Sequence, residues 1–294
     1  MIDIDQYLDE KRKKVNRALK KFRAQSGPAA VIDAMNYSLE AGGKRLRPIL
    51  TLAVADTLGS EDDSIIDVAC ALELVHTYSL IHDDLPAMDD SDLRRGKPTC
   101  HKVYGEAIAV LAGDALLTLA FEVLGSYGRQ EGYAGKAIKI IAELSGASGV
   151  RGMIGGQVLD LEAEGKELTR AEVEDISAKK TGALLRAAVI CGAIAADASL
   201  EEQKILSAYA SNIGTAFQIT DDLLDLESSA EELGKPVGAD RERFKPTYPA
   251  VIGPEEARRE AEIFYQQSVA SLRNLNQPAE LLQELARKLV FRKK

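Results

Sequence analysis

The chain has 294 residues, with 46 acidic against 37 basic side chains and a formal net charge of -9. This acidic balance argues against a nucleic acid as the main partner, because DNA and RNA are themselves polyanions. The length suffices to bury a large core, and no linker-like, low-complexity or repeated segment divides it. We therefore expect a single domain over residues 1–294.

The N-terminal segment lacks the apolar stretch of a signal peptide, and no run of about 18 apolar residues occurs in the sequence. The 3 cysteines are far apart and in no CxxC spacing, as expected of reduced thiols. These features predict a soluble, cytoplasmic protein without a membrane span.

Apolar residues recur at the helical period along almost the whole chain, and no alternating strand pattern is bounded by hairpin turns. We expect an all-α fold, a bundle of about ten or more helices. The segment that follows Asp62 and Asp63 is apolar around most of its circumference, which predicts a central helix. The expected helices cover residues 5–24, 29–41, 46–59, 65–84, 105–126, 132–149, 153–163, 169–196, 199–227, 254–275 and 278–290.

A dense acidic cluster lies where the central helix ends. Its members are Asp83, Asp84, Asp89, Asp90 and Asp92. Two carboxylates about 4 Å apart repel by roughly 4 kcal/mol at an effective dielectric constant near 20. Cations must neutralise such a cluster, so this stretch predicts a metal site.

A second acidic group lies far downstream, where Asp221 and Asp225 are one helical turn apart and Gln218 shares their face. Neither group contains a cysteine or a histidine between its aspartates. Carboxylates alone suit hard cations, and a few carboxylates completed by water and substrate phosphates are the usual ligands of Mg²⁺. The two clusters therefore predict a cleft at the mouth of the bundle that holds Mg²⁺ and a phosphorylated substrate.

Pro86 bears on the geometry of the first cluster. Asp83 and Asp89 are six residues apart, which on a regular helix places them about 240° apart around the axis. A proline removes one helical hydrogen bond and clashes with the preceding turn. We expect a break near Pro86 that brings Asp89 back beside Asp83, whereas a straight helix from 83 to 89 would contradict this interpretation.

The two clusters and the segments around them resemble the trans-prenyltransferases, or polyprenyl diphosphate synthases, and most closely the short-chain farnesyl diphosphate synthases of bacteria. The family motif DDxx(xx)D followed by RR matches residues 83–95, and its second motif, DDxxD, matches residues 221–225. Further signatures follow in family order: GGKRLRP (42–48), AGDALL (112–117), GGQVLDL (155–161), KKTGALL (179–185), FQ (217–218) and GKPVGAD (234–240).

The resemblance implies the all-α isoprenoid synthase fold around a central cavity, and a reaction that joins isopentenyl diphosphate to an allylic diphosphate with release of diphosphate. It also implies about three Mg²⁺ ions per active site. Asp83, Asp89 and Asp221 would hold these ions, while Asp84 and Asp225 would act through water or as second-layer partners.

Two sets of cationic side chains are implied by the same resemblance. The allylic diphosphate would be bound by Arg94, Lys180, Lys235 and, with less support, Lys245. The isopentenyl diphosphate would be bound without metal by Lys44, Arg47, His76 and Arg95. Arginine suits this second site because its planar guanidinium grips phosphate in a bidentate manner.

The resemblance further implies that the allylic carbocation is stabilised by the Thr181 hydroxyl, the Lys180 carbonyl and the Gln218 amide oxygen. Gly182 inside a helix costs about 1 kcal/mol relative to alanine. It suggests a local kink that frees the Lys180 carbonyl. The departing diphosphate itself would take the final proton.

Product length should depend on the depth of the cavity below the first motif. Tyr78 and Ser79 lie about 6 to 8 Å down the helix from Asp83. A bulky Tyr78 resembles the cavity floor of bacterial farnesyl synthases and predicts a fifteen-carbon product. The alternative is that Tyr78 is ordinary core packing.

Three other functions are alternatives. A geranylgeranyl diphosphate synthase with a deeper pocket stays open, because only the surroundings of Tyr78 separate it from a farnesyl synthase. A non-catalytic regulatory subunit is less favoured because both acidic motifs are intact, and a terpene cyclase because GGKRLRP is intact. Homodimers are usual in the family, and the apolar run 105–124 is the candidate contact face.

Overall fold

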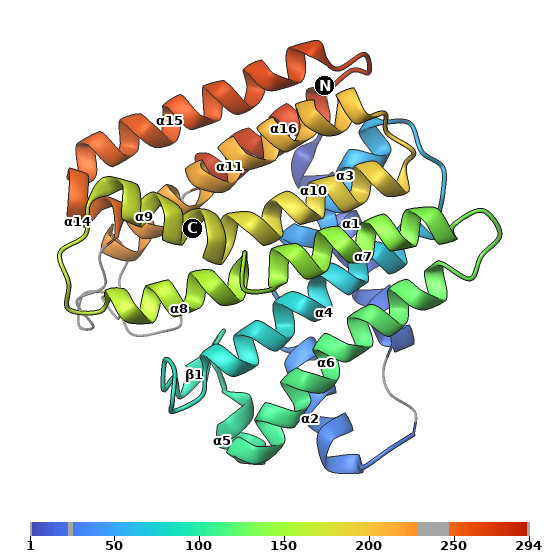
Figure 1. Cartoon of the computed structure of the whole chain (residues 1–294), viewed down its shortest axis with the longest axis vertical. Coiled ribbons are helices and arrows are strands. Elements are labelled where there is room, and N and C mark those ends of the chain that lie inside the picture. Colours follow the sequence, from blue (N-terminus) through green and yellow to red (C-terminus); the bar gives the residue numbers. More distant parts are fainter. Residues whose placement is uncertain (1, 23–25, 228–246, 293–294) are drawn as a thin grey trace.

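The computed structural model describes residues 2–22, 26–227 and 247–292. Within these residues the chain is almost entirely helical, which confirms the all-α prediction (Figure 1). The layers of helices pack side by side around a common apolar core.

The centre of the fold is α4 (Ile65–Asp83), which packs against α3 (Leu46–Thr57), α6 (Glu106–Tyr127) and α10 (Ala183–Ala195). Most α4 side chains are buried, and they lie on every face of the helix. Burial of such a helix on all sides is what its composition predicts. The expected central position of this helix is therefore confirmed.

The other helices surround these four. α11 packs on α10 and α15, and α16 lies against α15. α2 packs on α6, whereas α1 lies against α3 and α4 and also contacts α16. The longer outer helices are α1 (Ile4–Leu19), α2 (Ala29–Glu40), α7 (Ala134–Ser148), α8 (Met153–Ala163), α9 (Arg170–Ser177), α11 (Leu200–Glu227), α15 (Pro254–Ser271) and α16 (Glu280–Val290). The short ones are η1 (Lys20–Phe22), α5 (Cys100–Tyr104), α14 (Tyr248–Ile252) and η3 (Leu272–Asn274).

The structure differs from the expected helices at several points, among them two short helices that were not predicted, α5 and α14. The helix expected over 169–196 is interrupted by the π-helix η2 (Ala178–Gly182). The helices expected to reach 24 and 275 end earlier in the 3₁₀ turns η1 and η3, since last turns commonly tighten in this way. A hairpin of β1 (Leu93–Arg94) and β2 (Lys97–Pro98) was not predicted, because two-residue strands are too short to show a period.

The break near Pro86 is confirmed. The helix α4 ends at Asp83, and residues 84–89 turn back on themselves. The Asp89 amide donates to the Asp83 carbonyl at 2.8 Å, so the backbones of these two residues are adjacent. The turn therefore places Asp89 beside Asp83, as the metal-site hypothesis requires.

Two helices, α4 and α6, are long and apolar enough to cross a bilayer by length and composition. Both contain acidic residues, so neither is an uninterrupted apolar run. For α4, 72% of the apolar window is buried inside the protein, and a core helix passes such a test as readily as a membrane span.

Candidate functional site

The first acidic cluster lies at the C-terminal end of α4. The Asp83 carboxylate is half-buried and forms no ion pair within the described residues. Burial raises the pKa of Asp83 to about 6, an effect that the charge of Lys180 opposes and that of Asp89 reinforces. Such a carboxylate gains most from a cation that replaces the water it has lost.

Asp84 has a different environment. Its carboxylate is buried, and both of its oxygens accept a hydrogen bond from Arg94 Nε at 2.8 Å. Arg94 Nη2 also lies 2.7 Å from Asp84 Oδ1. This bidentate pair fixes the guanidinium against the end of α4. Asp84 is therefore engaged by a guanidinium in this structure.

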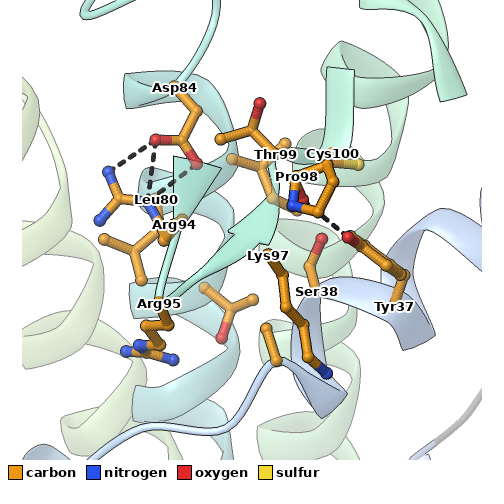
Figure 2. Close-up of a pocket in the computed structure, with 13 residues that line it drawn as sticks. Tyr37, Ser38, Leu80, Asp84, Arg94, Arg95, Lys97, Pro98, Thr99 and Cys100 are labelled. Atoms are coloured by element: carbon orange, nitrogen blue, oxygen red, sulfur yellow. Dashed lines mark hydrogen bonds and ion pairs between the residues drawn. The ribbon is translucent and has the colours of Figure 1, made fainter. Parts of the chain in front are cut away.

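Figure 2 shows the hairpin that carries the two predicted arginines and the pocket behind it. The pocket lies between the hairpin, α2 and α4. Arg94 turns toward Asp84, whereas Arg95 extends from the hairpin turn toward the loop after α2 and donates to the Gly42 carbonyl. The Tyr37 hydroxyl donates to the Pro98 carbonyl at 2.7 Å, which secures the hairpin against α2. The adjacent arginines thus reach different parts of the molecule.

The second acidic cluster occupies the last turns of α11. Asp221 is exposed and pairs with the buried Arg292 guanidinium at 2.5 Å. Arg292 also stacks over the Phe217 ring, 4.1 Å from its centroid. Asp225 lies one turn beyond Asp221, as predicted. In this structure a guanidinium therefore occupies the position of a cation at Asp221.

Gln218 is oriented by its neighbour one turn later. Its amide nitrogen Nε2 donates to Asp222 Oδ1 at 2.7 Å, and the other oxygen of Asp222 accepts the Tyr248 backbone amide at 3.1 Å. Because the nitrogen donates to Asp222, the amide oxygen of Gln218 is left as an acceptor for another group. This is the atom that the carbocation hypothesis requires.

The π-helix η2 carries Lys180 and Thr181, and confirms that the helix is irregular next to Gly182. Lys180 Nζ lies 2.6 Å from Asp160 Oδ2 of α8. Gly214 of α11 packs on Gly182, since a Cβ there would lie 3.4 Å from the Gly182 Cα. Gln218 is one helical turn after Gly214, so α11 brings it to the same region as Thr181.

Of the predicted isopentenyl-site residues, Lys44 and Arg47 lie around the start of α3. His76 lies on α4, and Arg95 lies in the hairpin turn. Burial lowers the pKa of Arg47 to about 10, although Glu73 and Asp221 oppose the shift. Burial, and then the charge of Arg47, holds the pKa of His76 well below its usual value, so this imidazole is neutral at pH 7. Partial burial, and then Arg292, lowers the pKa of Lys44. These shifts indicate a group of cationic side chains close enough to repel one another.

Tyr78 and Ser79 lie within α4, below the first cluster. Tyr78 is buried, its ring makes an edge contact with His82 at 5.7 Å between centroids, and its hydroxyl has no hydrogen-bond partner. Burial, and then the charge of Asp83, raises the pKa of Tyr78 to about 12. Ser79 donates to the His76 carbonyl at 3.0 Å. Tyr78 is thus a bulky side chain that is buried within the protein, below the first acidic cluster.

The donor chemistry at the two helix ends fits a hard cation, since it consists of carboxylate oxygens alone. Among the described residues, no three His, Cys, Asp or Glu side chains gather closely enough to hold a metal by themselves. Mg²⁺ commonly binds one or two carboxylates and completes its shell with water and substrate phosphates. The residues therefore fit a site that a phosphorylated substrate would complete.

A comparison of the sequence with known families decides the assignment. Residues 28–285 match the polyprenyl synthetase family. The chain belongs to this family. It is a prenyltransferase, and the resemblance inferred from its motifs is confirmed.

Several known proteins are similar to this prenyltransferase over nearly their full length. The farnesyl diphosphate synthase of Bacillus subtilis is 46% identical over 280 residues, which cover 95% of each chain. The geranylgeranyl diphosphate synthase of Cyanophora paradoxa is 46% identical over 263 residues, 89% of this chain and 87% of that protein. The structure of the geranyltransferase of Helicobacter pylori, complexed with magnesium and isoprenyl diphosphate, matches this fold with a TM-score of 0.85 and 33% sequence identity. The match covers 99% of this chain and 97% of that chain.

Two predicted ligands of the prenyltransferase, Lys235 and Lys245, lie outside the described residues. Sequence reasoning missed other participants: the Asp160 partner of Lys180, and the buried pair of Arg45 and Glu73 beside the isopentenyl-site group. Arg45 and Asp160 do lie inside recognised motifs, which was the available signal. Their partners could not be read from the sequence.

Proposed function

We propose that this prenyltransferase condenses isopentenyl diphosphate with dimethylallyl and geranyl diphosphates to give farnesyl diphosphate. The observation that carries the proposal is the pairing of two acidic helix ends with two separate cationic groups. Lys180 and Arg94 lie near the end of α4, while Lys44 and Arg47 lie near Asp221. Two diphosphates in two electrostatically distinct positions are what the condensation needs.

The proposed metal ligands are Asp83, Asp89 and Asp221, with Asp84 and Asp225 supporting them. Bound Mg²⁺, at about three ions per site, would supply positive charge that stabilises the departing diphosphate. Asp84 holds Arg94 in place through its bidentate contact. The irregular end of α4 brings the backbones of Asp83 and Asp89 together because the chain turns back over residues 84–89, around Pro86.

The allylic diphosphate is proposed to contact Arg94 and Lys180, together with Lys235 and Lys245 from the undescribed segment. Isopentenyl diphosphate is proposed to contact Lys44, Arg47, Arg95 and neutral His76. A neutral imidazole can donate one hydrogen bond to a phosphate without adding charge to a crowded cationic group. The positive side chains are poised for an anion because their mutual repulsion falls when diphosphate binds.

We propose that three oxygen atoms stabilise the allylic carbocation as the carbon–oxygen bond breaks: the Thr181 hydroxyl, the Lys180 carbonyl and the Gln218 amide oxygen. The Asp222 contact holds Gln218 Nε2, so the amide oxygen is the atom of this group that is proposed to face the carbocation. The π-helix frees carbonyl groups from the regular helical ladder. Preorganised dipoles of this kind lower the barrier without reorganising during the reaction. The isopentenyl double bond then attacks, and the released diphosphate removes the proton.

The test is incubation of the purified protein with isopentenyl diphosphate, Mg²⁺ and either dimethylallyl or geranyl diphosphate, followed by chromatography of the dephosphorylated products. Farnesol is expected, with loss of product when Mg²⁺ is chelated. A twenty-carbon alcohol would favour the geranylgeranyl alternative, which the relative from Cyanophora paradoxa keeps open. Absence of any condensation product with either allylic starter would overturn the proposal.

Product length should depend on Tyr78. We expect Tyr78→Ala to shift the main product from fifteen to twenty or more carbons, because it removes a ring from the proposed floor of the cavity. Tyr78→Phe is the matched control: the hydroxyl has no hydrogen-bond partner, so its removal should leave product length unchanged. An unchanged product from Tyr78→Ala would mean that this residue only packs the core.

We propose a cytoplasmic homodimer, with residues 1–294 of each copy forming one domain. Exposed apolar side chains gather on α6, α7 and α8, among them Leu111, Ile138 and Ile154. A second copy would bury them. We expect Leu111→Glu combined with Ile138→Glu to halve the molar mass measured by light scattering after size-exclusion chromatography. Leu200→Glu, on an exposed apolar residue of α11, is the control, and dimers that survive the double change would contradict this interface.

Arg292 should compete with metal for Asp221. We expect Arg292→Met to raise the apparent affinity for Mg²⁺, titrated calorimetrically with inorganic pyrophosphate present, by about two- to fivefold, the scale of a partly exposed ion pair. Arg287→Met removes a surface arginine of α16 that pairs with Glu284, and should leave the titration unchanged. Weaker Mg²⁺ binding by Arg292→Met would show that the guanidinium supports the loaded site.

A further inference from the structure

A buried ion pair lies directly behind the proposed isopentenyl diphosphate site. Arg45 Nη1 is 2.6 Å from Glu73 Oε1, and the two side chains are 3% and 2% exposed. The other donors of Arg45 are also used: Nε donates to Asn16 Oδ1 at 2.9 Å, and Nη2 donates to the Leu39 carbonyl at 2.6 Å. One guanidinium therefore ties α1 and the end of α2 to the central helix α4.

The backbone of Arg45 is unusual. Its φ of 52° and ψ of 36° lie in the left-handed region, which non-glycine residues rarely adopt. Arg45 is the residue before the first turn of α3, with Lys44 on one side and Arg47 two positions later. The left-handed turn therefore determines how Lys44 and Arg47 leave the chain, and the side-chain contacts of Arg45 hold that turn in place.

Glu73 reaches beyond Arg45. It lies three residues before His76 on α4, so the two side chains share one face of the helix. Burial lowers the pKa of both Arg47 and Arg95, and the negative charge of Glu73 opposes both shifts. Glu73 Oε2 and Arg47 Nε are both buried and have no hydrogen-bond partner. Glu73 is thus the anion that several cations of this site share.

We propose that Arg45 and Glu73 are positioning residues for the isopentenyl diphosphate site: their buried ion pair sets the direction of Lys44 and Arg47 and balances the charge of the cluster. Neither side chain touches the substrate. A buried pair is weak evidence for stability, because apolar replacements of both partners often preserve it. The buried pair is kept beside a cationic site because it positions the side chains that bind phosphate. The inference rests on the proposed function and adds two residues to it.

The test separates positioning from plain stability. Three variants are compared, Arg45→Met, Glu73→Leu and Arg45→Met with Glu73→Leu, by steady-state kinetics and thermal melting. The single variants should melt lower, because each strands a buried charge, whereas the double variant should melt close to the unsubstituted protein. All three should raise KM for isopentenyl diphosphate about tenfold or more. KM for geranyl diphosphate should change less than about twofold, since the metal-binding side is untouched.

A double variant that folds and keeps the original KM for isopentenyl diphosphate would overturn the proposal. If the Met and Leu variants do not fold, Arg45→Lys keeps the charge but cannot make three directed contacts, and should raise the same KM. An unaltered KM in that variant would also overturn it.

The matched control is the pair of Arg186 and Glu143, also at 2.6 Å, which joins α10 to α7. Arg186→Met with Glu143→Leu should leave both KM values unchanged. Absence of condensation by the unsubstituted protein would refute the proposed function, whereas normal condensation with no selective KM change would refute this inference alone.

Discussion

Asp83→Asn is expected to lower kcat by about 10³-fold or more, because the amide is nearly isosteric but carries no charge for a bound cation. The Asp83 carboxylate is half-buried and has no ion pair in the described part of the chain, so its loss breaks no ion pair among these residues. Stability should therefore change little while turnover collapses. Asp221→Asn should act in the same direction.

The measurement for Asp83 combines kinetics with a binding signal that needs no turnover. Mg²⁺ with inorganic pyrophosphate should raise the melting temperature of the unsubstituted protein, since a ligand that binds only the folded state stabilises it. The shift should shrink in Asp83→Asn. Asp92→Asn is the control, because Asp92 belongs to the same acidic stretch but is exposed and pairs with Lys102 at 2.7 Å. Activity of Asp83→Asn above about a tenth of the original would contradict the assignment.

The fold was largely predictable because helical periodicity is a local signal. The central helix, its end at the first aspartates and the turn around Pro86 all follow from composition and from proline stereochemistry. The hairpin at 93–98 was missed because each strand has two residues. The sequence predicted a kink next to Gly182 but not that it would be a π-helix. A sequence pattern does not encode which hydrogen-bond register an irregular turn adopts.

The candidate site was predictable residue by residue but not contact by contact. Motifs supplied the aspartates, lysines and arginines. Their partners lie far away in the chain: Arg292 is 71 residues from Asp221, and Glu73 is 28 residues from Arg45. Only packing of α16 near α11, and of α4 behind the start of α3, creates these pairs. Side-chain charge is therefore readable from sequence, whereas its neutralisation depends on the tertiary structure.

The contact of Gly156 with η2 also depends on tertiary packing, and replacing this glycine should have a large effect on turnover. This buried glycine of α8 packs directly on the backbone of η2, and a Cβ there would lie 2.6 Å from the Lys180 Cα. Neither backbone can yield without moving the π-helix. We expect Gly156→Ala to lower kcat about 10²-fold, because a displacement of about 1 Å in a reacting group has that consequence. Overpacking should also reduce the free energy of unfolding by about 1–3 kcal/mol.

Steady-state kinetics and urea denaturation of Gly156→Ala provide the measurement. Gly135→Ala is the matched control, since Gly135 lies in the first turn of α7 and a Cβ there would meet no atom within 4 Å. That substitution should leave kcat unchanged and raise stability slightly, by the lower backbone entropy of alanine in a helix. If Gly156→Ala behaves like Gly135→Ala, then α8 does not determine the position of Lys180 and Thr181. Loss of kcat with the two KM values retained would instead show that this backbone contact aligns the oxygens that face the carbocation.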